Sequence, residues 1–105
     1  MHALDVLADP VRRRILELIA DGEQPAGVVT ETIRSEFGIT QPAVSQHLRV
    51  LRESGVATVR RDGTRRLYAV DADAVREAHD WIGRLWRPHL DALETEIARG
   101  KRRKQ

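Results

Sequence analysis

The chain has 105 residues, of which 41% are hydrophobic and 32% are charged, and it contains no cysteine. This length allows one domain with one hydrophobic core, and the composition is that of a globular protein rather than a disordered or fibrous one. The lack of cysteine excludes disulfides, thiolate metal ligands and cysteine nucleophiles, but it leaves the redox compartment open. No stretch approaches the ~18 apolar residues of a membrane span or the apolar core of a signal peptide, so we expect a cytoplasmic protein without a membrane partner.

The formal net charge of +2 is unevenly distributed along the chain. Residues 1–39 and residues 71–99 each carry a net charge of −3, whereas residues 40–70 carry +4 and residues 100–105 carry another +4. Positive charge gathered in two segments is typical of a protein that binds nucleic acid, although a basic segment can also be a solvated surface without a partner. The charge alone leaves both interpretations open.

Three helices are predicted in the first third of the chain. Apolar residues spaced three and four apart define one helical face, which Asp9 and Pro10 interrupt as a helix cap and a first-turn proline. The pattern predicts a short first helix, a second from Pro10 to about Ala20, a polar break over residues 21–25, and a third helix over residues 26–37 that Gly38 ends. The residues of the first face are Leu4, Leu7, Val11, Ile15 and Leu18.

A fourth helix is predicted over residues 40–54, with Thr40 as its N-cap. Val44, Leu48 and Leu51 share one face of this helix, so the opposite face and its flanks carry mainly polar side chains. These outward residues are Gln41, Pro42, Ser45, Gln46, His47 and Arg49. Two helices joined by a short turn, the second with polar side chains outward, indicate a helix-turn-helix whose second helix reads DNA.

Residues 57–70 are predicted to form a β-hairpin. Two runs that can pair flank Asp62-Gly63, a dipeptide favoured in tight turns, and Val59, Leu67 and Val70 supply apolar anchors. Arginines crowd the tip, where they suit contacts with the phosphate backbone of DNA. The predicted DNA-binding residues of the hairpin are Arg60, Arg61, Gly63, Thr64, Arg65 and Arg66.

A long last helix is predicted from about Asp73 to Ala98, with a kink near residues 84–87 caused by Pro88. Its apolar stripe is wider than one small domain needs. Trp81 and Trp86 favour a helix-to-helix contact in a symmetric dimer, although both can instead cover the core of the monomer. The stripe consists of Val75, Ala78, Ile82, Leu85, His89, Leu93 and Ile97, broadened by Trp81, Trp86 and Leu90. We therefore predict a single domain over residues 1–99 and a disordered basic tail over residues 100–105.

Three motifs, taken together and in this order, resemble the ArsR family of bacterial winged helix-turn-helix repressors. They are LADPVRRRIL at residues 7–16, QPAVSQHLRVL at residues 41–51 and GTRRLY at residues 63–68. The resemblance covers nearly the whole chain and implies a mainly α fold, in which residues 40–54 enter the major groove, residues 57–70 form the wing and a long C-terminal helix dimerises. It implies a homodimer joined through the first and last helices, with contacts from Leu4, Leu7, Val75, Ala78, Ile82, Leu85, Trp86, His89 and Leu93.

The resemblance further implies a sequence-specific repressor that binds an inverted repeat in double-stranded DNA without a metal or other cofactor. Residues 86–94 look like the metal-free members of the family, which often repress their own operon, and the lack of cysteine excludes the arsenic and cadmium sites of other members. One alternative is a zinc- or nickel-gated sensor, because Glu77, His79, Asp80, His89 and Asp91 faintly resemble the metal sites of further members. A second alternative is a protein-interaction adaptor, whose wing arginines would meet an acidic partner. An unknown small-molecule or protein effector is compatible with each reading.

No catalytic constellation is found in the sequence, so we do not expect an enzyme. Ser45 and His47 lie two apart on one helix and cannot face each other, and no glycine-rich phosphate loop is present. His47 lies on a flank of the predicted recognition helix, where contact with a base edge and half-buried packing are both compatible with its position.

Overall fold

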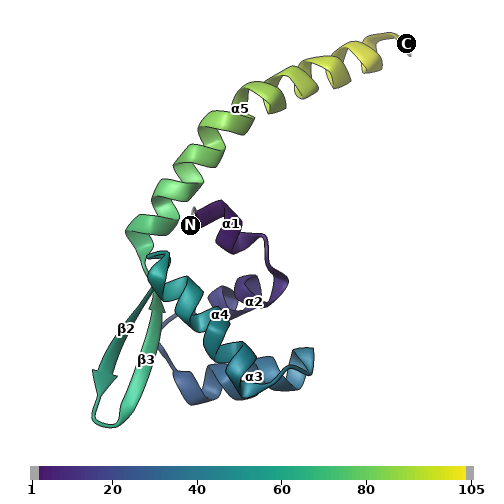
Figure 1. Ribbon diagram of the computed structural model, residues 1–105. Helices are drawn as coiled ribbons and strands as arrows, with labels where there is room; N and C mark the ends of the chain where they lie inside the picture. Colours follow the sequence, from purple (N-terminus) through teal and green to yellow (C-terminus); the bar gives the residue numbers. More distant parts are fainter. Residues whose placement is uncertain (1–2, 104–105) are drawn as a thin grey trace. The chain divides into compact units, whose positions relative to one another are not determined.

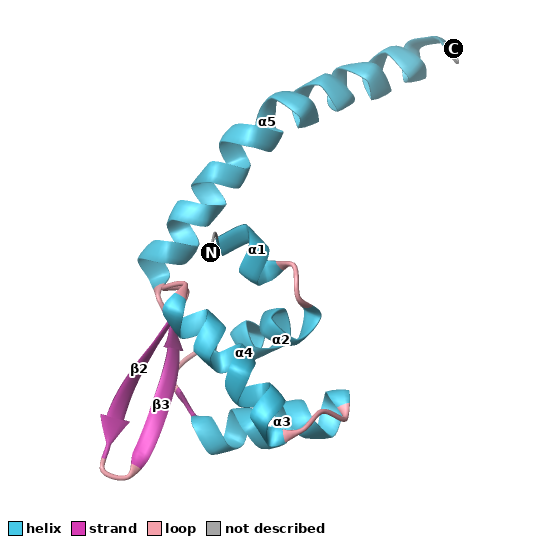
Figure 2. Cartoon of the chain, in the orientation of Figure 1, coloured by secondary structure: helices cyan, strands magenta, loops and turns pink. Residues whose placement is uncertain are grey.

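The structure is a computed structural model that describes the backbone of residues 3–103 and the side chains of residues 5–100. Figures 1 and 2 show its helices and strands. The residues up to Val75 form one compact unit and those from Arg76 onward form another. A single domain over residues 1–99 stays a prediction. The elements are α1 (Ala3–Leu7), α2 (Pro10–Ile19), β1 (Gln24–Pro25), α3 (Ala26–Phe37), α4 (Gln41–Glu53), β2 (Ala57–Asp62), β3 (Arg65–Val70) and α5 (Ala72–Arg103).

The ends of α2, α3 and α4 confirm the predicted caps. Oδ1 of Asp9 accepts hydrogen bonds from the backbone N–H groups of Val11 and Arg12, at 2.8 and 3.1 Å. Thr40 caps α4 in the same way, since its Oγ1 lies 3.4 Å from the backbone nitrogen of Ala43. Gly38 ends α3 in the left-handed conformation, with φ of 66°, which costs glycine little because it has no Cβ.

Replacing Asp9 by Ala is expected to lower the free energy of unfolding by about 1 kcal/mol at neutral pH, because two N–H groups of α2 lose their acceptor. Partial burial of Asp9 disfavours the ionised form, but hydrogen bonds from the backbone of Arg12 and Val11 outweigh it and hold the pKa of this carboxyl below its ordinary value. A carboxyl with a lowered pKa stabilises the folded chain above the unfolded-state pKa of about 4, and this contribution is lost as the pH falls through the folded-state pKa.

Urea unfolding of the wild type and of Asp9→Ala over a series of pH values measures this difference. The difference in the free energy of unfolding between the two proteins should become smaller as the solution becomes acidic. A difference in the free energy of unfolding that does not change with pH would show that the charge of the Asp9 carboxylate does not stabilise the folded chain.

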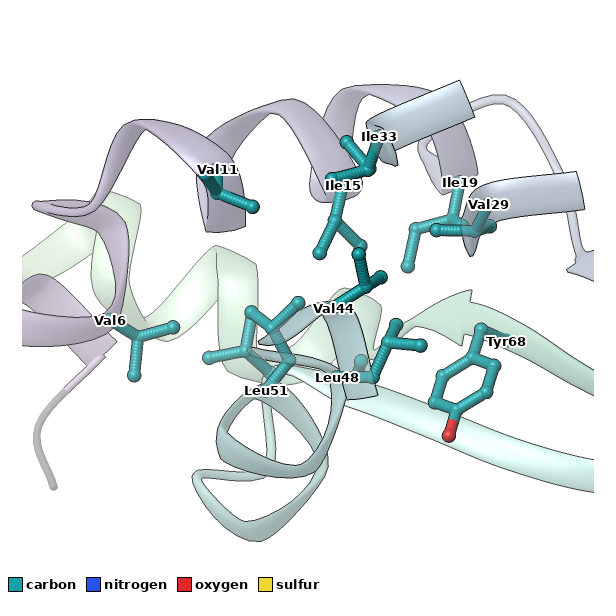
Figure 3. Packing of buried hydrophobic residues seen from close by; sticks show 12 residues of the cluster. Val6, Val11, Ile15, Ile19, Val29, Ile33, Val44, Leu48, Leu51 and Tyr68 are labelled. Atoms are coloured by element: carbon teal, nitrogen blue, oxygen red, sulfur yellow. The ribbon is translucent and has the colours of Figure 1, made fainter. Parts of the chain in front are cut away.

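The hydrophobic core is built by α2, α3 and α4 together with the sheet. Figure 3 shows Ile15, Ile33 and Val44 from these three helices facing one another. The predicted inward face of α4 is confirmed, since Val44, Leu48 and Leu51 are all buried. In α2 the inward position belongs to Ile19, whereas Leu18 is only half-buried. The buried cluster comprises Val6, Val11, Ile15, Ile19, Val29, Ile33, Val44, Leu48, Leu51, Val56, Ala57 and Tyr68.

The predicted hairpin is confirmed, and it carries a third strand that the sequence pattern does not indicate. β2 and β3 are antiparallel, with Ala57 opposite Val70 and Asp62 opposite Arg65. β1 pairs with the other edge of β3, so the strand order is β1-β3-β2. The predicted break between α2 and α3 over residues 21–25 is confirmed, but its last two residues, Gln24 and Pro25, form a strand that was not predicted. A strand of two residues is too short to show alternation, and Pro25 is tolerated because β1 lies at a sheet edge.

The last helix, α5, is longer than predicted at both ends and continues through Pro88. Figure 1 shows it curving without a break, so the proline bends the helix rather than ending it. Residues 100–103 are helical where a disordered tail is predicted, while residues 104–105 lie outside the described part of the chain. No helix among the described residues is long and apolar enough to cross a membrane.

Candidate nucleic-acid interface

The outward face of α4 is polar and exposed, as its helical spacing predicts. Arg49 and Gln46 are joined on this face, because Nη2 of Arg49 donates a hydrogen bond to Oε1 of Gln46 at 2.6 Å. This hydrogen bond restricts the rotation of both side chains, and both residues stay exposed. The predicted DNA-binding residues that are exposed at this face are Thr40, Gln41, Pro42, Ser45, Gln46 and Arg49.

His47 is the exception among the predicted residues of α4. Its side chain is only 21% exposed, and its Nδ1 lies 4.0 Å from Oδ1 of Asp9, the cap of α2. Nδ1 is buried and has no hydrogen-bond partner within the part of the chain that the structure describes. Of the two readings of His47, half-buried packing against α2 is the one that the structure shows.

The hairpin tip presents exposed basic side chains, with one difference from the prediction. Arg61, Arg65 and Arg66 are exposed, as are Gly63 and Thr64 of the turn. Arg60, in contrast, forms an ion pair with Glu23, in which Nε–Oε2 and Nη2–Oε1 are 2.6 and 2.8 Å apart. These hydrogen bonds lower the pKa of Glu23 and raise that of Arg60. The sequence pattern cannot reveal this pair, because the two residues lie 37 positions apart and meet only where β1 joins the sheet.

Because Glu23 neutralises Arg60, we expect Arg60→Gln to weaken DNA binding less than Arg65→Gln does. Conversely, Glu23→Gln should strengthen binding to any duplex, by about five-fold at physiological salt, which is the value of one added phosphate contact. Fluorescence anisotropy with a labelled duplex measures all three variants. Equal losses for Arg60→Gln and Arg65→Gln, with no gain for Glu23→Gln, would show that Glu23 does not limit the contribution of Arg60 to DNA binding.

A pocket of about 350 Å³ lies between α4 and β3 and brings the two predicted DNA-binding segments together. Ser45, Gln46 and Arg49 line it from α4, and Arg66 lines it from β3. Arg52 and Tyr68 also line it, although neither is among the predicted site residues. The three-residue spacing from Arg49 to Arg52 was a signal for one of them, since such residues are neighbours on a helix. No sequence signal places Tyr68 beside α4.

The predicted dimer contacts of α5 are mostly exposed. Trp86 and Leu93 have exposed fractions of 53% and 57%, and the same stripe continues to Ile97 at 58%. Ile82 of α5 is half-buried, and so is Leu7 of α1. Ala78 is buried, and the side chain of Leu4 lies outside the described residues. The exposed predicted contacts are Val75, Leu85, Trp86, His89 and Leu93.

The residues of the metal-gated alternative are also on α5. Nδ1 of His79 lies 3.7 Å from Oδ1 of its neighbour Asp80, and both side chains are largely exposed. Within the described residues, no three histidine or acidic side chains lie close enough to hold a metal ion. The described residues of a single chain therefore do not bring together the ligands of a zinc or nickel site.

In sequence, the chain is similar to known transcriptional regulators. Residues 7–60 match the family model of a helix-turn-helix domain. The chain is 30% identical over 81 residues to the transcriptional repressor SdpR of Bacillus subtilis, covering 77% of this chain and 86% of that protein. It is 34% identical over 85 residues to the HTH-type transcriptional regulator Rv2034 of Mycobacterium tuberculosis, covering 81% of this chain and 76% of that protein.

The fold is similar to solved structures of the same kind. A crystal structure of a possible transcriptional regulator for arsenical resistance matches with a TM-score of 0.72 and 34% identity, covering 91% of this chain and 96% of the other. The homodimeric winged helix-turn-helix DNA-binding domain of Mb0332 from Mycobacterium bovis, a possible ArsR-family regulator, matches with a TM-score of 0.60 and 27% identity, covering 82% of this chain and 76% of the other.

Proposed function

Because this chain belongs to the ArsR family of winged helix-turn-helix transcriptional regulators, we propose that it acts as a homodimer that represses transcription from an inverted-repeat DNA site. The observation that carries this proposal is the exposed polar face of α4 beside the exposed arginines of the β2–β3 hairpin. An α-helix fits the major groove, where base edges differ, while arginines suit the adjacent phosphates.

In this proposal Gln46 is the residue that reads a base. A glutamine amide can donate to and accept from one adenine edge, which makes it sensitive to sequence. The hydrogen bond from Arg49 restricts the amide of Gln46 before DNA arrives, so less side-chain entropy is lost on binding. Arg65 and Arg66, at the start of β3, would instead contact phosphates and contribute affinity without sequence preference.

The exposed apolar stripe of α5 supports the homodimer. A helix that exposes Trp86, Leu90 and Leu93 together presents a surface that monomeric proteins normally bury. The similar Mycobacterium bovis domain is itself homodimeric. Two copies related by a two-fold axis would place two α4 helices on one face of DNA, where they read half-sites about 10 base pairs apart or a multiple of that spacing.

The variant Gln46→Ala tests which helix reads the bases. We expect it to lose discrimination at one position of each half-site, by about 1–3 kcal/mol, and to keep the salt dependence of the wild type. The measurement is selection of bound sequences from a random duplex pool by the wild type and by the variant. Gln24→Ala is the control, because it removes the same amide from β1 and should select the same sequences as the wild type. If Gln46→Ala also selects the wild-type sequences, α4 is not the reading helix.

A further inference from the structure

We propose that His47 is a positioning residue, which ties α4 to the cap of α2 when its imidazole is protonated and thereby holds α4 in the orientation that reads DNA. This inference rests on the proposed function, because its consequence is a change in DNA affinity. Its structural part is a proton-dependent contact between His47 and Asp9, and this part can be tested without DNA.

The Nδ1 atom of His47 is a buried polar atom whose hydrogen bond is missing. The side chain as a whole is 21% exposed, but Nδ1 itself is buried and has no hydrogen-bond partner within the described residues. Buried polar atoms are nearly always hydrogen-bonded, so each exception calls for an explanation. Oδ1 of Asp9 lies 4.0 Å from Nδ1, which is beyond hydrogen-bond distance but within reach of a small movement of either side chain.

Protonation of the imidazole supplies the missing hydrogen bond. Neutral histidine carries one N–H group, whereas protonated histidine carries an N–H group on each ring nitrogen. A protonated Nδ1 can donate to the carboxylate of Asp9, and a hydrogen bond between opposite charges is about twice as strong as a neutral one. Histidine ordinarily takes up this proton near pH 6.5, so a range from pH 8 to pH 5.5 spans the change.

Asp9 stays ionised over this range and keeps room for a further donor. Its partial burial disfavours the ionised form, but backbone hydrogen bonds from Arg12 and Val11 outweigh burial and hold the pKa of the carboxyl below its ordinary value. These two N–H groups use two of the roughly four acceptor positions of the carboxylate. The imidazolium of His47 would therefore meet a negative charge that can accept its proton.

The other charged groups of the surrounding helices do not take this place. Arg12 also acts on the carboxylate of Asp9, but its guanidinium donates to the backbone oxygens of Val6 and Asp5 in α1, at 3.0 and 3.4 Å. Arg13 of α2 and the carboxylate-bearing Asp5 of α1 are exposed. Arg14 of α2 pairs with Glu17 and Glu36. The residues one turn away from His47 on α4 carry no charge; they are Ala43, Val44, Val50 and Leu51.

The position of His47 on α4 explains how this contact would act on DNA reading. Gln46, just before it, is exposed on the outward face, and Leu48, just after it, is buried in the core. Apolar contacts such as those of Leu48 are not directional, whereas a hydrogen bond is. A bond from His47 to the cap of α2 therefore restricts the rotation of α4 and the direction of Gln46. If DNA binds this orientation more tightly, it also favours proton uptake by His47, because coupling between two ligands is reciprocal.

The arm of the test without DNA is a double-mutant cycle with Asp9→Asn and His47→Gln. Asparagine caps a helix as well as aspartate does and glutamine keeps a neutral donor, so both variants should fold. Urea unfolding of the wild type, the two single variants and the double variant gives the coupling between the two side chains. We expect this coupling to change the unfolding equilibrium about five-fold at pH 5.5 and hardly at all at pH 8. The gain precedes the loss of the Asp9 contribution below about pH 4.

The arm with DNA measures affinity for the preferred duplex and for an unrelated duplex at pH 8 and pH 5.5, at one salt concentration, by fluorescence anisotropy. The wild type should bind the preferred duplex about five-fold more tightly at pH 5.5, which is the size of the coupling, and the unrelated duplex should gain less. His47→Gln and Asp9→Asn should both lose this gain. The control His79→Gln, which removes an exposed histidine of α5, should keep it.

Coupling at pH 5.5, together with a gain in affinity that both variants lose, supports the proposal. A gain that is equal for the two duplexes, or that Asp9→Asn retains, would show that the imidazolium only attracts phosphates, and the positioning role would be wrong. A cycle without coupling at pH 5.5 would overturn the contact itself. If the wild type binds no DNA at all, the proposed function fails, while the double-mutant cycle still decides whether the contact between His47 and Asp9 forms.

Discussion

A variant that carries both Trp86→Glu and Leu93→Glu is expected to be monomeric and to bind DNA about 100-fold or more weakly than the wild type at physiological salt. Both side chains lie on one face of α5, seven residues apart, and each is more than half exposed in a single chain. Negative charges at these two positions would disrupt an apolar contact between two copies of the chain. They would lower the stability of the single chain little, because both side chains are exposed in it. Two half-sites bound by a linked pair gain about 10²–10⁴ in affinity over one half-site, and the monomer loses that gain.

Sedimentation and fluorescence anisotropy measure this pair of effects. The control is Thr95→Glu with Ala98→Glu, which adds the same charge to the opposite face of α5 and should leave a dimer with nearly unchanged affinity. A Trp86→Glu, Leu93→Glu variant that remains dimeric would show that the contact between copies lies elsewhere. A monomer with the affinity of the wild type would show that dimerisation does not contribute to DNA binding.

The double variant Arg65→Gln, Arg66→Gln is expected to bind every duplex about 30-fold more weakly at physiological salt, with a salt slope reduced by about 1.8. The reason is the loss of two phosphate contacts from the exposed tip of the hairpin. The preferred sequence should not change, because phosphates carry no direct sequence information. This is the reverse of the effect expected for Gln46→Ala.

Titration of the preferred duplex and of an unrelated duplex at several salt concentrations measures this effect. Arg13→Gln combined with Arg99→Gln removes the same charge from α2 and α5 and serves as the control. A loss confined to the preferred duplex would mean that the wing arginines contact bases, and the assignment to phosphates would be wrong.

Local features of the fold could be predicted because they repeat within a few residues. The inward face of α4 follows from the spacing of Val44, Leu48 and Leu51, and Asp9 and Thr40 are recognised as caps from residue type and position. The strand β1 could not be predicted in this way. Only two residues long, it exists because the backbone of Gln24–Pro25 pairs with β3, more than 40 residues further along the chain.

The same distinction separates the predicted and unpredicted parts of the site. The outward residues of α4 follow from helical geometry, and the exposed arginines of the hairpin follow from its turn. The ion pair between Arg60 and Glu23 depends on tertiary structure, as does the contact between His47 and Asp9. The position of His47 in the sequence left two interpretations open, contact with a base edge and half-buried packing. Its neighbour in space, Asp9, caps another helix and is far from it in the sequence.

The C-terminal end of α5 could not be predicted from the spacing of apolar residues. The apolar stripe stops at Ile97, so the pattern that marks the helix face stops there as well. The helix nevertheless continues to Arg103. Lysine and arginine are good helix formers, so a polar segment that follows an established helix can extend it without any buried face.

The central claim, a dimer that reads a specific DNA sequence without metal, is tested most directly by selecting bound sequences from a random duplex pool at physiological salt with chelator-treated protein. We predict recovery of one inverted repeat, with half-sites about 10 base pairs apart or a multiple of that spacing. Enrichment only after zinc or nickel is added would contradict metal independence and support the metal-gated alternative. No enrichment under either condition, with only weak and sequence-blind binding that is lost at physiological salt, would contradict DNA reading itself and support an adaptor.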